Sequence, residues 1–169
     1  MTDIKTKSMV RTAMFAALTF IATFIIKIPT PGTGGYIHPG DAMVILSGVF
    51  LGPLYGAAAA GIGSAMADIL GGYFFYAPIT FLIKGLTAFV CGQIFRHTLR
   101  PGQNERPKCV LCGLFSTIFV AAGYLLFELF IYGRAAVASV PSNLIQGLSG
   151  LVISNLLYTP IKKITKTLA

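Results

Sequence analysis

The chain is short of charge. Only 11% of its 169 residues are Asp, Glu, Lys or Arg, whereas 55% are hydrophobic. A soluble domain carries about 25% charged residues, and less than half of that cannot cover a surface that faces water. Together with a mean hydropathy of +0.79, this predicts an all-α integral membrane protein. The length predicts a single domain over residues 1–169.

The motifs of several enzyme classes are also absent. The sequence has no Walker motif, so we do not expect it to hydrolyse ATP by itself, and it has no H-E-x-x-H. Its two histidines, His38 and His97, lie at boundaries of apolar segments on opposite sides of the predicted membrane domain, and no Ser/His/Asp set can be assigned. We therefore expect no catalytic residue, metal or cofactor. The first apolar stretch has no small-residue cleavage site before a polar region, so we interpret it as a span and not as a signal peptide.

Cysteine is scarce as well. The chain has Cys91, Cys109 and Cys112, and the last two have C-x-x-C spacing. A zinc site would need two further ligands, and only His97 is near. We interpret these cysteines as small apolar residues at a membrane boundary.

Long apolar runs are what the sequence does contain. A membrane-spanning helix needs about 20 such residues, and the runs predict six transmembrane helices in one bundle. Their approximate ranges are 9–26, 42–52, 54–71, 77–95, 109–131 and 140–161. The second is short because Gly52 and Pro53 interrupt an uncharged stretch.

Basic residues gather between these runs, which explains the net charge of +8. Ten of the thirteen form three clusters, which are Lys5, Lys7 and Arg11; Arg96, Arg100, Arg106 and Lys108; and Lys162, Lys163 and Lys166. Six spans place all three clusters on one side, as the positive-inside rule requires of the cytoplasmic side. We therefore expect the chain to lie in the cell membrane with both termini in the cytoplasm. The basic clusters favour a lipid bilayer over nucleic acid as the partner.

The remaining charges near the spans lie at their outer ends or in their outer halves. They are Lys27, Asp41, Asp68, Lys84, Glu128 and Arg134. Ionisable groups within a membrane usually face a bundle interior or a wet cavity, so an outward-opening polar cavity would account for them together. For Lys27 and Arg134 we favour side chains that reach to interfacial water. For Lys84, a structural ion pair with Asp68 or Glu128 is the alternative to ligand contact.

Three outer segments carry residues suited to a ligand site. In YIHPGD, Tyr36 can stack on a flat ring, His38 offers a ring nitrogen, and Asp41 either offers a carboxylate or caps the following helix. In GGYFFYAP, Tyr73 and Tyr76 combine a ring with a hydroxyl, although such aromatics also form interfacial belts. In PSNLIQG, Asn143 and Gln146 share one helix face and can read the donors and acceptors of a heterocycle.

The first span contains a small-x-x-x-small pair, Ala13 and Ala17, which allows a second helix to approach closely. Packing within the same bundle is the alternative interpretation. A family resemblance over residues 9–163 rests on this pair and on the stretches GGYIHPGDAMVILSGVFLGPLYG, GIGSAMADILGGY and YAPITFLIKG. The chain resembles the substrate-binding subunits (S components) of energy-coupling factor (ECF) vitamin transporters.

That resemblance implies a six-helix subunit that binds a vitamin under the outer loops and lacks its own ATPase. Its implied partners are a transmembrane coupling protein, reached through Ala13 and Ala17, and two cytoplasmic ATPases. Because the chain has no tryptophan and several tyrosines, we favour a pyridoxine-like or hydroxymethylpyrimidine-like compound, then riboflavin. A self-sufficient carrier or channel, and a non-transport membrane enzyme or assembly factor, remain alternatives.

Overall fold

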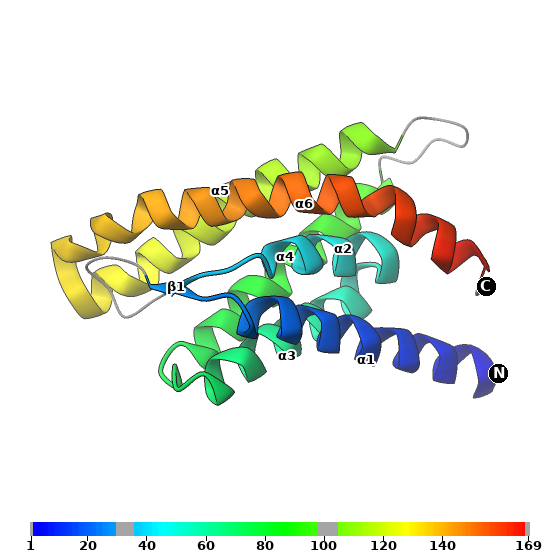
Figure 1. Cartoon of the computed structure of the whole chain (residues 1–169), viewed down its shortest axis with the longest axis horizontal. Coiled ribbons are helices and arrows are strands. Elements are labelled where there is room, and N and C mark those ends of the chain that lie inside the picture. The colour runs from blue at the N-terminus through cyan, green and yellow to red at the C-terminus, as the bar shows by residue number, and fades with distance from the viewer. Residues whose placement is uncertain (1, 30–35, 98–104, 168–169) are drawn as a thin grey trace.

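The computed structural model of the chain describes residues 2–29, 36–97 and 105–167, most of which are helical (Figure 1). In chain order the elements are α1 (Thr2–Phe24), β1 (Ile28–Pro29), β2 (Tyr36–Ile37), α2 (Asp41–Leu51), α3 (Pro53–Leu70), α4 (Ala77–His97), α5 (Arg106–Tyr132), the 3-10 helix η1 (Gly133–Ser139) and α6 (Val140–Thr167). The predicted all-α class is confirmed for these residues, whereas six membrane crossings remain a prediction. The turn residues expected at 30–35, and Arg100, lie outside the described residues.

Helix α2 is the centre of the bundle. It packs against α1, α3, α4, α5 and α6, and nine of its residues, from Asp41 to Val49, are buried. Its 11 residues give it a length of about 16 Å, which is less than the roughly 30 Å of a bilayer core. The short second span is therefore a core helix that the longer helices shield.

Glycines allow α2 to pack this closely on its neighbours. Gly52, with φ +80°, turns the chain between α2 and α3 in a conformation that glycine adopts readily. A Cβ on Gly56 of α3 would lie 2.7 Å from the Cα of Gly48, and a Cβ on Gly48 would lie 2.2 Å from the carbonyl oxygen of Ala88 in α4. The three helices thus meet backbone to backbone.

The two ends of the molecule differ in what they hold (Figure 1). The start of α1 and the end of α6 lie at one end, together with the last residues of α4 and the first residues of α5. The hairpin of β1 and β2 and the connection η1 lie toward the other end. Basic residues of the last turn of α4, Arg96 among them, are consequently far along the bundle from the hairpin.

Two short elements occur where the sequence predicted only loops. Strands β1 and β2 pair antiparallel, with Ile28 opposite Ile37 and Pro29 opposite Tyr36. The 132–139 segment is mostly the 3-10 helix η1, which begins at Gly133. Strands of two residues are too short to leave an alternating pattern in a sequence.

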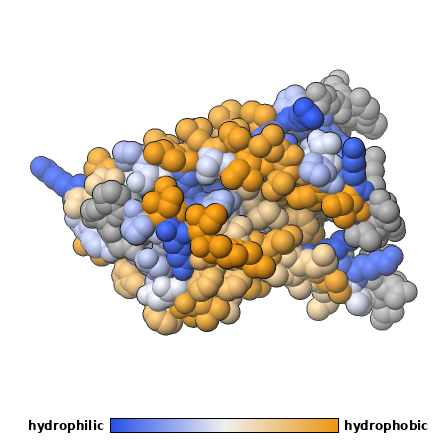
Figure 2. Space-filling model, in the orientation of Figure 1, coloured by the Kyte–Doolittle hydropathy of each residue, from blue (hydrophilic) through white to orange (hydrophobic). Residues whose placement is uncertain are grey.

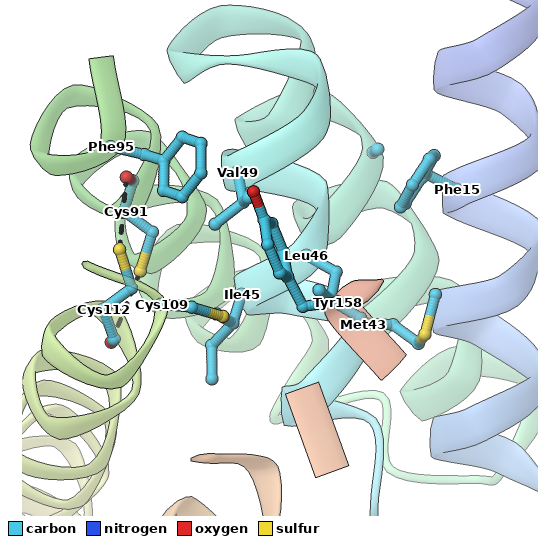
Figure 3. Close-up of a cluster of buried hydrophobic side chains, with 11 residues drawn as sticks. Phe15, Met43, Ile45, Leu46, Val49, Cys91, Phe95, Cys109, Cys112 and Tyr158 are labelled. Carbon is cyan, nitrogen blue, oxygen red and sulfur yellow. Dashed lines mark hydrogen bonds between the residues drawn. The ribbon is translucent and has the colours of Figure 1, made fainter. Parts of the chain in front are cut away.

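The larger core cluster surrounds the cysteines and Tyr158 (Figure 3). Cys91 donates to the carbonyl oxygen of Cys112 at 3.5 Å, and Cys112 donates to that of Cys91 at 3.4 Å. Cys109 is buried beside them, and all three are free thiols. Their place in the core agrees with the interpretation as small apolar residues.

The outer surface is rich in apolar side chains, which dominate the middle of the face in Figure 2. By length and composition, α4 (Ala77–His97) and the helical stretch Arg106–Ile164, which contains α5, η1 and most of α6, qualify as membrane-spanning among the described residues. Large exposed side chains such as Phe130 (92%) and Leu156 (70%) would be costly in water. This surface suits a lipid environment.

Candidate functional site

A polar cavity lies toward the hairpin end of the bundle. Five segments line it, namely β2 with the residues after it, the end of α3, the start of α4, the second half of α5 and the start of α6. The lining residues are Tyr36, His38, Asp68, Tyr76, Thr80, Tyr124, Glu128, Asn143 and Gln146. The cavity has about 350 Å³ of empty space, including the space at its mouth. Seven of the ten residues predicted to bind substrate are thus brought together around one space.

Tyr36 and Asp68 join the hairpin to the end of α3. The Tyr36 hydroxyl donates to Asp68 Oδ1 at 2.6 Å. Burial and the adjacent carboxylate raise the pKa of Tyr36 above its usual range, so the hydroxyl stays protonated and keeps donating. The Tyr36 ring packs against Tyr73 with 4.5 Å between centroids, and Lys27 Nζ lies 5.0 Å from the Tyr36 centroid. Tyr73 therefore supports Tyr36 from outside the cavity lining.

His38 is buried, with 8% of its surface exposed. Its ring nitrogen Nδ1 accepts from the backbone N–H of Gly40 at 3.1 Å. The backbone N–H of His38 donates to Gln146 Oε1 at 3.1 Å. Burial lowers the pKa of His38 to about 3, and the Lys84 charge adds to this effect. The imidazole is therefore neutral at physiological pH.

Asp41 has a different role from the helix cap considered above. The residue that caps α2 is Gly40, with no side-chain hydrogen bond, and Asp41 Oδ1 lies 2.5 Å from Lys84 Nζ. Asp41 Oδ2 accepts from Gln146 Nε2 at 3.1 Å. Lys84 thus pairs with Asp41, and the alternative interpretation of an ion pair with Asp68 or Glu128 is wrong. Lys84 and Asp41 are both 0% exposed. Neither residue lines the cavity, so their ion pair lies behind the lining residues.

Gln146 connects this ion pair to the segment that carries His38. Its amide oxygen accepts from the His38 backbone and its amide nitrogen donates to Asp41. Both ends of the amide are therefore used by the protein. Lys84, Asp41, Gln146 and His38 form one buried chain of polar contacts from α4 through α2 and α6 to the hairpin end.

Glu128 is the second carboxylate of the lining and is 2% exposed. Its Oε1 accepts from the Tyr76 hydroxyl at 3.1 Å, and its Oε2 accepts from the Ser139 hydroxyl. Asn143 Nδ2 donates to the Ser139 oxygen at 3.4 Å. Helices α4, α5 and α6 are thereby joined through η1 at the cavity.

Sequence reasoning missed three residues of this region. Tyr124 and Thr80 line the cavity, where their hydroxyl oxygens are 2.9 Å apart, and Ser139 binds Glu128. Tyr124 precedes Glu128 by four residues, so helical spacing alone would place it on the same face. Thr80 likewise follows Tyr76 by four residues.

Other highlighted residues lie away from the cavity. Phe74 and Phe75 are 67% and 64% exposed, as expected of an interfacial belt. Ala13 and Ala17 are exposed on α1, and Arg134 is exposed on η1. The small pair is therefore not buried within this bundle.

A helical bundle with an apolar exterior and a polar cavity at one end is the architecture of a membrane protein that binds a small molecule. The comparisons with known proteins narrow this class. The chain belongs to the family described as "ECF-type riboflavin transporter, S component", whose model matches residues 3–163. The resemblance found in the sequence is thus confirmed, and the chain is of the kind that serves as substrate-binding component of an ECF transporter.

One relative and one solved structure resemble the chain over most of its length. A Pyrococcus woesei protein described as "Uncharacterized protein in gap 3'region" is 33% identical over 144 residues, which are 85% of this chain and 93% of that protein. A solved structure described as "Structure and mechanism of the S component of a bacterial ECF transporter" matches with a TM-score of 0.71 and 20% identity over 96% of this chain and 99% of that chain. At this identity the second match shows the fold.

Membership also bears on partners. Components of this family are membrane-embedded and work with a membrane coupling protein and ATPases. This transport role favours a transporter subunit over an enzyme.

Proposed function

We propose that this chain captures a small heteroaromatic vitamin or vitamin precursor at the outer face of the cell membrane. A transmembrane coupling protein and two cytoplasmic ATPases would then drive its uptake. The observation that carries the proposal is the cavity itself. It draws aromatic, amide and carboxylate side chains from five segments of the chain to the end of the bundle that lies away from the termini.

The outward orientation of the cavity follows from the distribution of basic residues. Arg96 lies in the last turn of α4, Lys108 lies in the first turn of α5, and Lys162 lies in the last part of α6. All three belong to the end opposite the hairpin, and an excess of Lys and Arg marks the cytoplasmic side. Both termini would then be cytoplasmic, and the cavity would open to the outside.

The ten predicted substrate-binding residues divide into two groups under this proposal. We expect Tyr36, His38, Asp68, Tyr76, Glu128, Asn143 and Gln146 to surround the ligand, because they line the cavity. We expect Asp41, Lys84 and Tyr73 to hold those residues in place, because their contacts are to lining residues.

The size of the cavity favours a small ligand. Its interior measures about 30 Å³, well below the roughly 300 to 1,000 Å³ of ligand pockets, so any ligand would require the cavity to widen. A single ring with short substituents, such as a pyridoxine-like or hydroxymethylpyrimidine-like compound, would require less widening than riboflavin. Riboflavin is the second candidate because the family description names it.

A thermal-shift screen of the detergent-purified chain against water-soluble vitamins and their precursors tests the proposal. A ligand that binds only the folded chain raises its Tm by mass action, so one compound should raise it in a concentration-dependent way. A flat response to the whole panel would contradict the proposal. Uptake by cells that express this chain without partner subunits would instead favour a self-sufficient carrier or channel.

A further inference from the structure

The charge of the cavity points to the charge of its ligand, and this inference rests on the proposed function. The lining contains two carboxylates, Asp68 and Glu128, which are 4% and 2% exposed. None of the described lining residues is Lys or Arg. Buried charges are stable only when they are paired or well hydrogen-bonded, so the partners of each carboxylate matter.

Asp68 is incompletely satisfied. Oδ1 accepts from Tyr36 at 2.6 Å, whereas Oδ2 is buried and has no partner of good hydrogen-bond geometry among the described residues, although the Thr80 hydroxyl is near enough to interact with the carboxylate. Asp68 is also a lining residue. A ligand group that donates to Oδ2 would supply what the protein leaves out, and a charged donor would do so most strongly.

Glu128 can accept more as well. Each of its oxygens receives one hydroxyl, from Tyr76 and from Ser139, and a carboxylate oxygen accepts about two hydrogen bonds. Both present donors are neutral, so neither offsets the negative charge. The second carboxylate therefore adds to the attraction for a cation.

The nearby cations do not cancel this charge. Lys84 Nζ lies 5.3 Å from the Tyr124 centroid, but its charge is paired with Asp41 at 2.5 Å. Lys27 packs over the rings of Phe24, Tyr36 and Tyr73 and is not a lining residue.

The imidazole of His38 is neutral because burial lowers its pKa to about 3. The residues that line the cavity therefore carry two formal negative charges, from Asp68 and Glu128, and no positive one.

The rings of the lining suit a cation too. Tyr36, Tyr76 and Tyr124 all border the cavity, and the face of an aromatic ring attracts a cation. We propose that the cavity selects a heteroaromatic compound with a protonated amino group, with the amino group against Asp68 Oδ2 and the ring among these three tyrosines. The proposal favours an amine over its hydroxyl or carboxylate analogue of equal size.

Calorimetric titration with two matched series tests this charge preference. The first is pyridoxamine, pyridoxine and 4-pyridoxic acid, which share one ring and differ in one substituent that is cationic, neutral or anionic. The second is 4-amino-5-aminomethyl-2-methylpyrimidine and its 5-hydroxymethyl analogue, which differ in one substituent that is cationic or neutral, with riboflavin as a neutral reference. In the series that binds, the amine should bind at least tenfold more tightly than its hydroxyl analogue, and 4-pyridoxic acid should not bind.

Variants then locate the preference. Asp68→Asn should reduce the preference for the amine at least tenfold and leave the affinity for the hydroxyl analogue nearly unchanged, and Glu128→Gln should act in the same direction. Glu105→Gln is the matched control, because Glu105 pairs with Lys162 at the other end of the chain's bundle, and it should leave the preference intact. If Asp68→Asn does not fold, the wild-type series and Glu128→Gln still decide.

The outcomes separate this inference from the proposed function. If riboflavin or a hydroxyl analogue binds as tightly as any amine, the charge preference is wrong while vitamin capture stands. If no compound in either series or the wider vitamin panel binds, the proposed function fails and the inference fails with it.

Discussion

Lys84 Nζ lies 2.5 Å from Asp41 Oδ1, and both side chains are completely buried. The pair joins α4 to the first residue of α2, the helix at the centre of the bundle. Gln146 extends it to α6 and to the backbone of His38. We therefore expect these two charges to hold the cavity in shape.

Removal of one member of this pair should be costly. Lys84→Met leaves the Asp41 carboxylate buried with only Gln146 as donor, and such a change destabilises by about 3–5 kcal/mol. The double variant Lys84→Met with Asp41→Leu should recover much of the loss, because no buried charge remains. Thermal unfolding of the detergent-purified variants measures both effects.

A control for that comparison is Glu105→Gln. Its partner Lys162 is 34% exposed, and partly exposed ion pairs are worth about 0–1 kcal/mol. A Lys84→Met variant as stable as Glu105→Gln would show that the buried pair is not needed.

Tyr36 should be required for ligand affinity. Its ring borders the cavity and its hydroxyl holds Asp68, so Tyr36→Ala should weaken binding at least tenfold, which is about 1.4 kcal/mol. Tyr36→Phe keeps the ring and should lose less. His38→Ala should also weaken binding about tenfold or more, because the residue lines the cavity. Titration with the compound that raises the Tm measures each affinity.

Phe74→Ala is the control for aromatic loss in the same region, since Phe74 is 67% exposed and is not a lining residue. Its affinity should equal that of the unaltered chain. Unchanged affinity in both Tyr36→Ala and His38→Ala would mean that the YIHPGD segment is only a connection.

The helices and the location of the polar cavity could be predicted from the sequence. In a membrane the backbone must satisfy its own hydrogen bonds, so long apolar runs become helices, and charges at one end of those runs mark a polar space. Tyr36, Asp68 and Glu128 were found in this way, because a polar residue stands out in an apolar chain.

The contacts within the site were harder to predict. Asp41, Asp68 and Glu128 were all available to Lys84, and only the packing of α2 against α4 selects Asp41. Tyr124 lies in an apolar helix with nothing local to distinguish it from a packing residue. Pair contacts between helices depend on their relative rotation, which no single-chain pattern encodes.

Acid should destabilise the chain partly through His38. Its pKa of about 3 in the folded chain lies below the ordinary value of 6.5, so the unfolded chain binds a proton that the folded chain excludes. Stability contributed by this group is complete above about pH 6.5 and declines as the pH falls toward 3. The Tm should therefore drop between pH 7.5 and 5.

His38→Gln removes the titrating group and should reduce that drop. His97→Gln is the matched control, because His97 is exposed at the end of α4 and lies away from the cavity. Equal drops in the unaltered chain and in His38→Gln would count against a neutral, buried imidazole.

Ala13 and Ala17 should serve association with the coupling protein and not the fold. Both are exposed on α1, and small residues four apart allow a partner helix to approach closely. Ala13→Leu with Ala17→Leu should therefore keep the Tm and the ligand affinity but abolish co-purification with the coupling protein. Ala122→Leu, which enlarges an exposed alanine of α5, should leave the complex intact. A double variant that still co-purifies in full would refute the docking role, and loss of ligand binding would instead assign the pair to the bundle itself.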